Sequence, residues 1–127
     1  MKTINRNARK RPEDALQSQI VSFARSNFDR REWRLFHVPN GGKRTKAEAG
    51  RFVALGVSSG VPDLVLVGPE GFVGWIEVKA PKGVTSGPQD DWAEFLSATG
   101  HRYGLVRSLD EFRALLVEWG APVRIRI

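Results

Sequence analysis

Three ionisable residues lie in the most strand-like segment of the sequence, residues 60–81 (GVPDLVLVGPEGFVGWIEVKAP). Asp63 begins one apolar run, and Glu77 and Lys79 lie in a second run beyond a Gly-Pro-Glu-Gly turn. Two apolar runs joined by such a turn predict a β-hairpin. Because successive side chains of a strand point to opposite faces, Glu77 and Lys79 share one face. The sequence therefore places two carboxylates and a lysine where burial should disfavour charge.

The hairpin would bring the two carboxylates together. A turn that places Val67 opposite Val73 also places Asp63 opposite Glu77, with their Cβ atoms about 5 Å apart. Two like charges in that arrangement are destabilising, and a cation between them would relieve the repulsion. Carboxylate oxygens suit Mg²⁺ or Mn²⁺, and Lys79, about 7 Å along the same face, could contact a phosphate or an attacking water. The alternative is structural: Asp63 caps the turn and Glu77 pairs with Lys79.

Two further polar residues begin the inward faces of predicted helices. Glu13 lies on the side of the first helix that also carries Leu16, Ile20, Phe23 and Asn27. Asp14 is rotated by about 100° from that side, so Glu13 is the better third acidic group. Gln89 begins the apolar side of a later helix and could orient a water or contact the substrate backbone. The structural alternatives are a Glu that favours the helix dipole and a polar residue near a helix start.

Positive charge dominates the composition and is unevenly distributed. The formal net charge is +6 and the isoelectric point is near 10.3, which favours polyanionic partners, chiefly nucleic acid. Residues 1–11 form a basic arm that we expect to be flexible. A second basic segment surrounds a Gly-rich turn, with Asn40, Gly41, Gly42, Lys43, Arg44, Lys46 and Arg51 as candidate DNA-contacting residues. A solubilising arm and a solvated basic turn are the alternatives.

The rest of the chain predicts helices and strands in alternation. Helices are expected over residues 12–28, 45–55, 89–99 and 109–119, and strands over 33–38, 62–67, 72–79, 103–107 and 123–127. Pro12 would occupy the first position of the first helix. This order indicates an α/β fold, a mixed sheet flanked by helices, in a single domain over residues 12–127. The last strand could close the sheet or form a dimer edge.

Several classes of protein are disfavoured by the composition. The sequence contains no cysteine, which rules out disulfides and thiolate metal sites. No apolar run approaches the ~20 residues needed to cross a bilayer, and no apolar segment of a signal peptide follows the basic N-terminus. We therefore expect no membrane association and a cytoplasmic location. His37 and His101 are general-base candidates, although a lone histidine on a strand is more often structural.

Five short motifs, taken in order, resemble one known family. They are Glu13-x-x-Leu16-Gln17, Val38-Pro39-Asn40-Gly41-Gly42, Gly60-Val61-Pro62-Asp63, Ile76-Glu77-Val78-Lys79 and Gln89. Their order and spacing are similar to those of the VRR-NUC domain, the virus-type replication-repair nuclease branch of the PD-(D/E)XK superfamily. The resemblance spans about residues 12–112, and the G-x-P-D…E-x-K…Q series is considerably more specific than D…E-x-K alone.

The resemblance implies a restriction-endonuclease-like fold and a metal-dependent, structure-selective DNA endonuclease. It implies Mg²⁺ or Mn²⁺ held by Glu13, Asp63, Glu77 and the main-chain carbonyl of Val78. It implies Lys79 as the catalytic lysine and Gln89 as the glutamine of the extended motif, with 5′-phosphate and 3′-hydroxyl products. Small stand-alone phage and bacterial members imply a homodimer acting on four-way (Holliday) junctions, in DNA repair in a bacterial or phage-infected cytoplasm. A non-catalytic DNA-binding subunit, and flap, duplex or RNA substrates, are the alternatives.

Overall fold

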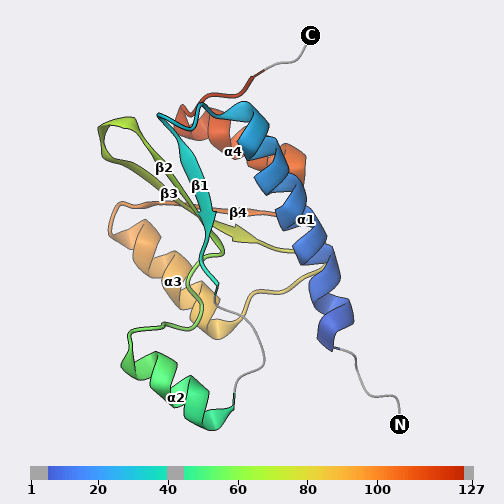
Figure 1. The fold of residues 1–127 in the computed structure, drawn as a ribbon, viewed down its shortest axis with the longest axis vertical. Helices are drawn as coiled ribbons and strands as arrows, with labels where there is room; N and C mark the ends of the chain where they lie inside the picture. The colour runs from blue at the N-terminus through green and yellow to red at the C-terminus, as the bar shows by residue number, and fades with distance from the viewer. Residues whose placement is uncertain (1–5, 40–44, 125–127) are drawn as a thin grey trace.

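A computed structural model describes residues 6–39 and 45–124 of the 127, with side chains from Pro12 onward. Its helices and strands follow the chain from the N-terminus as coloured in Figure 1. They are α1 (Arg6–Asn27), β1 (Arg34–His37), α2 (Lys46–Ala54), β2 (Leu64–Gly68), β3 (Phe72–Val78), α3 (Gly87–Ala98), β4 (Arg102–Val106) and α4 (Leu109–Trp119). No helix in these described ranges is long and apolar enough to cross a membrane.

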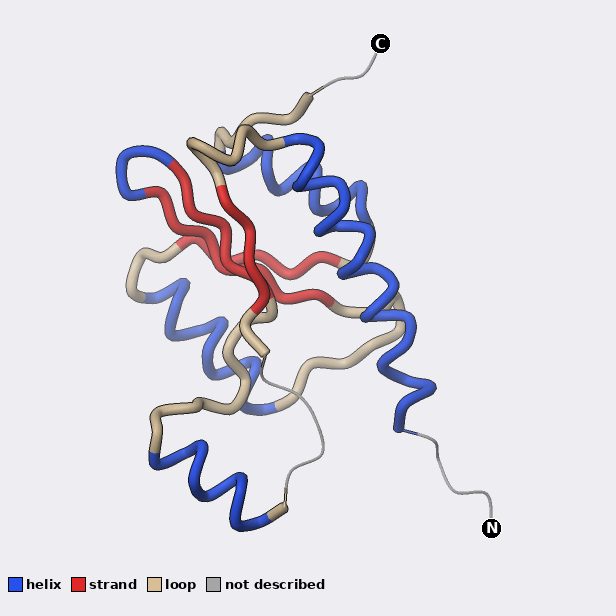
Figure 2. The backbone as a smooth tube through the Cα atoms, in the orientation of Figure 1, coloured by secondary structure: helices blue, strands red, loops and turns tan. Residues whose placement is uncertain are grey.

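Four strands form one mixed sheet in the order β1-β2-β3-β4, which is coloured red in Figure 2. The first two pairings are antiparallel, and β4 adds to β3 in parallel. Val67 lies opposite Val73 and Val65 opposite Trp75, so the predicted hairpin register is confirmed. The expected α/β fold, a mixed sheet flanked by helices, is therefore confirmed.

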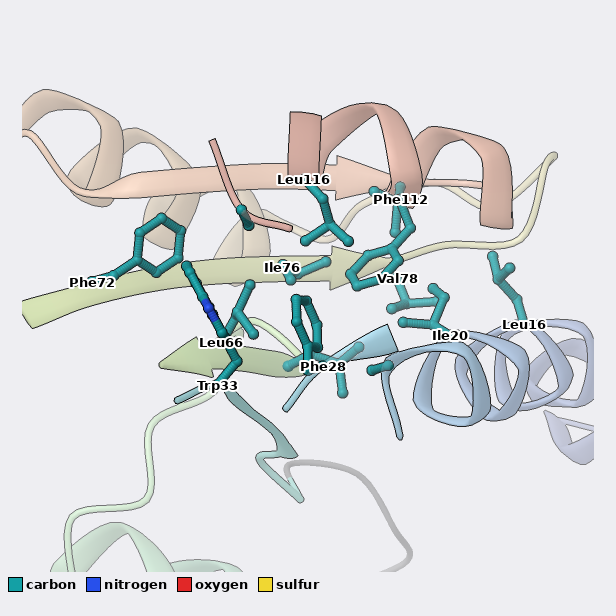
Figure 3. Close-up of a cluster of buried hydrophobic side chains, with 14 residues drawn as sticks. Leu16, Ile20, Phe28, Trp33, Leu66, Phe72, Ile76, Val78, Phe112 and Leu116 are labelled. Carbon is teal, nitrogen blue, oxygen red and sulfur yellow. The ribbon is translucent and has the colours of Figure 1, made fainter. Parts of the chain in front are cut away.

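The core lies on one face of the sheet, beneath α1 and α4. Ile20 of α1 and Phe112 of α4 are fully buried against the alternate residues of β2 and β3 that point the same way, Leu64, Leu66, Ile76 and Val78. Figure 3 shows these α1 and α4 side chains directed at Ile76 and Val78 of β3. Since side chains alternate along a strand, Glu77 between those two residues points to the other face.

The predicted start of the first helix is wrong. The first helix begins at Arg6, so Pro12 lies inside it and not at its first position, and residues 6–11 of the expected flexible arm are helical. Residues 1–5 lie outside the described part of the chain. Proline leaves one helical hydrogen bond unmade, but the helix continues because its next turns are anchored by burial of Leu16 and Ile20.

The strand predicted over residues 123–127 is also wrong where the structure describes it. Residues 121–124 are irregular, and 125–127 lie outside the described part of the chain. The segment is held by two hydrogen bonds to the buried side chain of Asn27, at the end of α1, and not by pairing with a strand. Asn27 Nδ2 donates to the carbonyl of Pro122 (2.8 Å), and its Oδ1 accepts from the N–H of Arg124 (2.6 Å).

A core substitution tests this packing. Phe112→Ala should lower the free energy of unfolding by about 3–5 kcal/mol, because a buried ring is lost and a cavity remains. Urea denaturation measures this loss, and the slope of the free energy of unfolding against urea concentration should stay the same. Val117→Ala on the same helix, where the side chain is 68% exposed, should change the free energy by less than about 0.5 kcal/mol. Equal losses in the two variants would contradict the placement of the core.

Candidate active site

Asp63 is held in place by both neighbouring strands. It directly precedes β2, and its carboxylate Oδ2 accepts a hydrogen bond from the N–H of Val78 in β3 (2.8 Å). Its main-chain carbonyl accepts from the N–H of Val38 (2.8 Å) and lies 2.8 Å from Nδ1 of His37. Because a carbonyl can only accept, that histidine nitrogen carries the proton. These bonds fix the carboxylate beside the end of β3.

Glu77 lies next to Asp63 and is almost completely buried, with 2% of its surface exposed. Its Oε1 accepts a hydrogen bond from Nε2 of Gln89 (2.9 Å). Burial is the largest cause that raises the pKa of Glu77 to about 9, and the charge of Asp63 and hydrogen bonding with Asp63 are the next largest. Glu77 is therefore protonated near neutral pH when no cation is present.

Lys79 brings a positive charge to the same place. Its side chain is 10% exposed, and its charge opposes the rise in the Glu77 pKa. The Nζ atom lies 3.7 Å from Oε1 of Glu13 on α1. Asp14 is exposed and lines a separate surface hollow with Gln17. Of the two acids in the first helix, Glu13 is thus the one that reaches this lysine.

Gln89 contacts Glu77 because the cap of α3 fixes it. Ser86 is the N-cap residue, and its hydroxyl accepts from the N–H of Gln89 (3.3 Å) while Gln89 Oε1 accepts from the N–H of Ser86 (2.9 Å). This reciprocal capping box orients the amide and leaves its NH₂ group directed at Glu77. The Ser86-x-x-Gln89 spacing is readable in the sequence, but we did not predict it.

Two more residues at the site had no sequence signal. Burial raises the pKa of Tyr103 on β4 to about 12, and the charge of Glu77 raises it too, so the phenol is close to the acidic pair. Arg107 donates from Nη1 to the carbonyls of Ala80 (2.8 Å) and Gly83 (2.7 Å), which anchors the loop after Lys79. Both residues reach the site only through the parallel pairing of β4 with β3.

The predicted site residues are only partly brought together. Asp63, Glu77, Lys79 and Gln89 are neighbours, whereas Glu13 joins them through Lys79. Among residues whose placement is described, no three His, Cys, Asp or Glu side chains group closely enough to hold a metal ion. Residues 40–44 of the basic segment lie outside the described part of the chain, and Lys46 and Arg51 are exposed on α2. His101 precedes β4 at the end of that strand remote from Glu77.

The assembled part of the site fits a divalent cation that prefers oxygen. Asp63 and Glu77 supply carboxylate oxygens, and Val78 lies between Glu77 and Lys79 at the end of β3. A buried Glu77 that keeps its proton at neutral pH beside the carboxylate of Asp63 is the arrangement that a cation would stabilise, because the cation would replace the proton. The neighbouring lysine then remains available to an anionic ligand.

Comparison with known families identifies the family to which the chain belongs. The family model of the VRR-NUC domain matches residues 3–110, most of the chain. The chain belongs to the VRR-NUC family, a family of nucleases. A solved structure described as a VRR_NUC domain protein is similar over 84% of this chain and 86% of that one, with a TM-score of 0.64 and 18% identity, which supports the fold alone. None of the curated proteins matches the sequence.

The resemblance found in the motifs is therefore confirmed at the level of the family. The hairpin that carries Asp63, Glu77 and Lys79 lies inside the matched residues of the VRR-NUC domain, as do Glu13 and Gln89. Their roles stay predictions, and the geometry above is what supports them.

Proposed function

We propose that this VRR-NUC chain is a divalent-metal-dependent, structure-selective DNA endonuclease that hydrolyses phosphodiester bonds, with branched DNA such as four-way junctions as substrate. The observation that carries the proposal is the contact of the buried Glu77 with the half-buried Asp63, beside Lys79. Burying Glu77 beside a second carboxyl group is costly in a fold of this size unless a cation binds there, and a carboxyl group with a strongly raised pKa is typical of a functional site. The positive net charge suits a nucleic-acid substrate.

Each residue has a role that its contacts support. Asp63 and Glu77, with Glu13 and the Val78 carbonyl as further candidates, would hold Mg²⁺ or Mn²⁺. The bound ion would supply Lewis-acid polarisation of the phosphate and a more acidic water. Lys79, oriented by its ion pair with Glu13, would stabilise negative charge that develops on the phosphoryl oxygens. Gln89 would keep the Glu77 carboxylate in the orientation needed for ligation.

The substrate is tested with a panel of labelled DNAs of equal strand length. Four-way junction, flap, single-stranded and linear duplex DNA, and a single-stranded RNA, are incubated with Mg²⁺, Mn²⁺ or EDTA. The proposal expects metal-dependent cleavage with 5′-phosphate products and a preference for the junction. Absence of metal-dependent cleavage on every substrate, with DNA binding retained, would instead identify a non-catalytic DNA-binding subunit.

Junction cleavage also implies a homodimer, because two active sites related by a two-fold axis can make paired incisions. Calibrated light scattering of the free protein and of the junction complex measures the number of chains. A single chain bound to each junction would overturn the dimer while leaving the chemistry intact.

The capping box separates two roles of Gln89. Ser86→Ala and Gln89→Ala each remove part of the α3 cap, so each should cost about 1 kcal/mol of unfolding free energy. Only Gln89→Ala removes the hydrogen bond to Glu77, so only it should also slow metal-dependent cleavage, by about tenfold. Equal cleavage rates in the two variants would show that Gln89 acts through the cap alone.

A further inference from the structure

A groove separates α1 from the outer edge of β1. Its volume is about 710 Å³, and its walls come from the second half of α1, the turn that follows, and all of β1. The sheet order makes β1 an edge strand, so one side of its backbone has no strand partner within the described chain. Lys46 and Arg51, the two candidate DNA-contacting residues that the structure describes, do not line this groove.

Three arginines give the groove its charge. Arg25, Arg30 and Arg34 line it, all three are exposed, and none forms an ion pair with any side chain that the structure describes. Arg31, one residue along the same turn, is instead paired with Asp29 at 3.0 Å and does not line the groove. No acidic residue is among the described residues that line it. The groove therefore has a concentrated positive charge that an anionic occupant would neutralise.

The groove is linked to Asp63 through His37. His37, the last residue of β1, lines it, and the same ring bonds through Nδ1 to the main-chain carbonyl of Asp63. Phe36 also lines the groove and leaves 49% of its surface exposed, whereas Trp33 is buried against Phe28 and Phe72. An accessible ring beside a row of arginines is the combination by which proteins hold unpaired bases and their phosphates.

We propose that the α1–β1 groove binds a single-stranded segment of nucleic acid and directs it toward Asp63. Arg25, Arg30 and Arg34 contact successive phosphates, and Phe36 contacts a base. A second copy of the chain, paired through β1 edges, fits less well because it would bring three more arginines against these three. That the bound strand is then cleaved rests on the proposed function, but binding in the groove does not.

The test measures binding without cleavage. Fluorescence anisotropy in EDTA compares a labelled oligothymidylate with a duplex of the same length, over a series of salt concentrations. The triple variant Arg25→Gln/Arg30→Gln/Arg34→Gln should bind the single strand more weakly, and its slope of log K against log salt should be smaller by about 2, since each phosphate contact contributes roughly 0.7. The corresponding triple Arg→Lys variant keeps the charge and should keep the slope.

Two more variants separate the groove from general charge and from folding. Arg31→Gln removes a nearby charge outside the groove and should leave the slope almost unchanged. Phe36→Leu should weaken single-strand binding by about tenfold without changing the slope, because stacking is lost and charge is not. Thermal melts of all variants should coincide with that of the wild type.

Three results would overturn the groove proposal. A triple Gln variant that binds the oligothymidylate like the wild type, or no more weakly than Arg31→Gln does, would overturn the proposal. So would equal losses for duplex and single strand, or a change from dimer to monomer by light scattering with DNA binding intact, which would make the groove an interface between copies. Undiminished cleavage by Asp63→Asn, with groove binding intact, would contradict the proposed function and leave the groove proposal standing.

Discussion

Asp63→Asn should reduce single-turnover cleavage by about a thousandfold or more, which corresponds to roughly 4 kcal/mol of activation free energy. Asparagine keeps the size of the side chain, and its Oδ1 can still accept from the Val78 N–H that now bonds Oδ2 at 2.8 Å. Only the charge is removed, so the fold should persist while the cation site loses a ligand. Quenched-flow or gel assays on the substrate cleaved fastest by the wild type measure the rate.

The matched control for this prediction is Asp14→Asn. Asp14 is an exposed carboxylate of α1 that lines a separate surface hollow, so its loss should change the rate less than about twofold. Glu13→Gln should also lower the cleavage rate, because Glu13 contacts Lys79. A rate for Asp63→Asn within a few-fold of the wild type, with both proteins folded, would contradict the assignment of this site.

Glu77→Gln should make the metal-free protein more stable at alkaline pH. In the folded chain the pKa of Glu77 is raised from an ordinary value near 4.5 to about 9. Between pH 4.5 and pH 9, Glu77 is ionised in the unfolded chain but keeps its proton in the folded chain. Its contribution to the free energy of unfolding therefore falls as pH rises, by up to about 1.4 kcal/mol per pH unit. Glutamine removes that dependence and can still accept from Gln89 and donate to Asp63.

The measurement is the free energy of unfolding in EDTA from pH 5 to pH 9. The difference between Glu77→Gln and the wild type should grow steadily over this range, whereas Glu118→Gln, at an exposed position of α4, should show no such trend. Added Mg²⁺ or Mn²⁺ should stabilise the wild type and not Glu77→Gln, because a ligand stabilises only the state that binds it. A constant difference across pH would show that Glu77 is not held protonated.

The sequence predicted the part of the site that strand alternation controls. Asp63, Glu77 and Lys79 lie on one hairpin, so the register of Val67 with Val73 was enough to place the two carboxylates together. The turn and the apolar runs carry that register locally, which makes it readable without any tertiary contact.

The rest of the site depends on packing between distant segments. The contact of Glu13 with Lys79 requires α1 to lie across the end of β3, and Tyr103 arrives through a parallel pairing that no local pattern encodes. The start of α1 was misplaced because a proline favours a first helical position but does not forbid an interior one when burial anchors the helix. The C-terminal strand was misplaced because an alternating pattern cannot reveal that Asn27 holds this segment.

Calorimetric titration of the metal-free protein with Mn²⁺ and Mg²⁺ tests the cation site most directly. Because Glu77 keeps its proton near neutral pH, a cation bound by Asp63 and Glu77 must displace that proton. We expect one site, lost in Asp63→Asn, with release of about one proton per ion at pH 7.5, measured from the binding heats in buffers of different ionisation enthalpy. Absence of binding by the wild type, or unchanged binding by Asp63→Asn, would contradict a metal-centred active site at the Asp63–Glu77 pair.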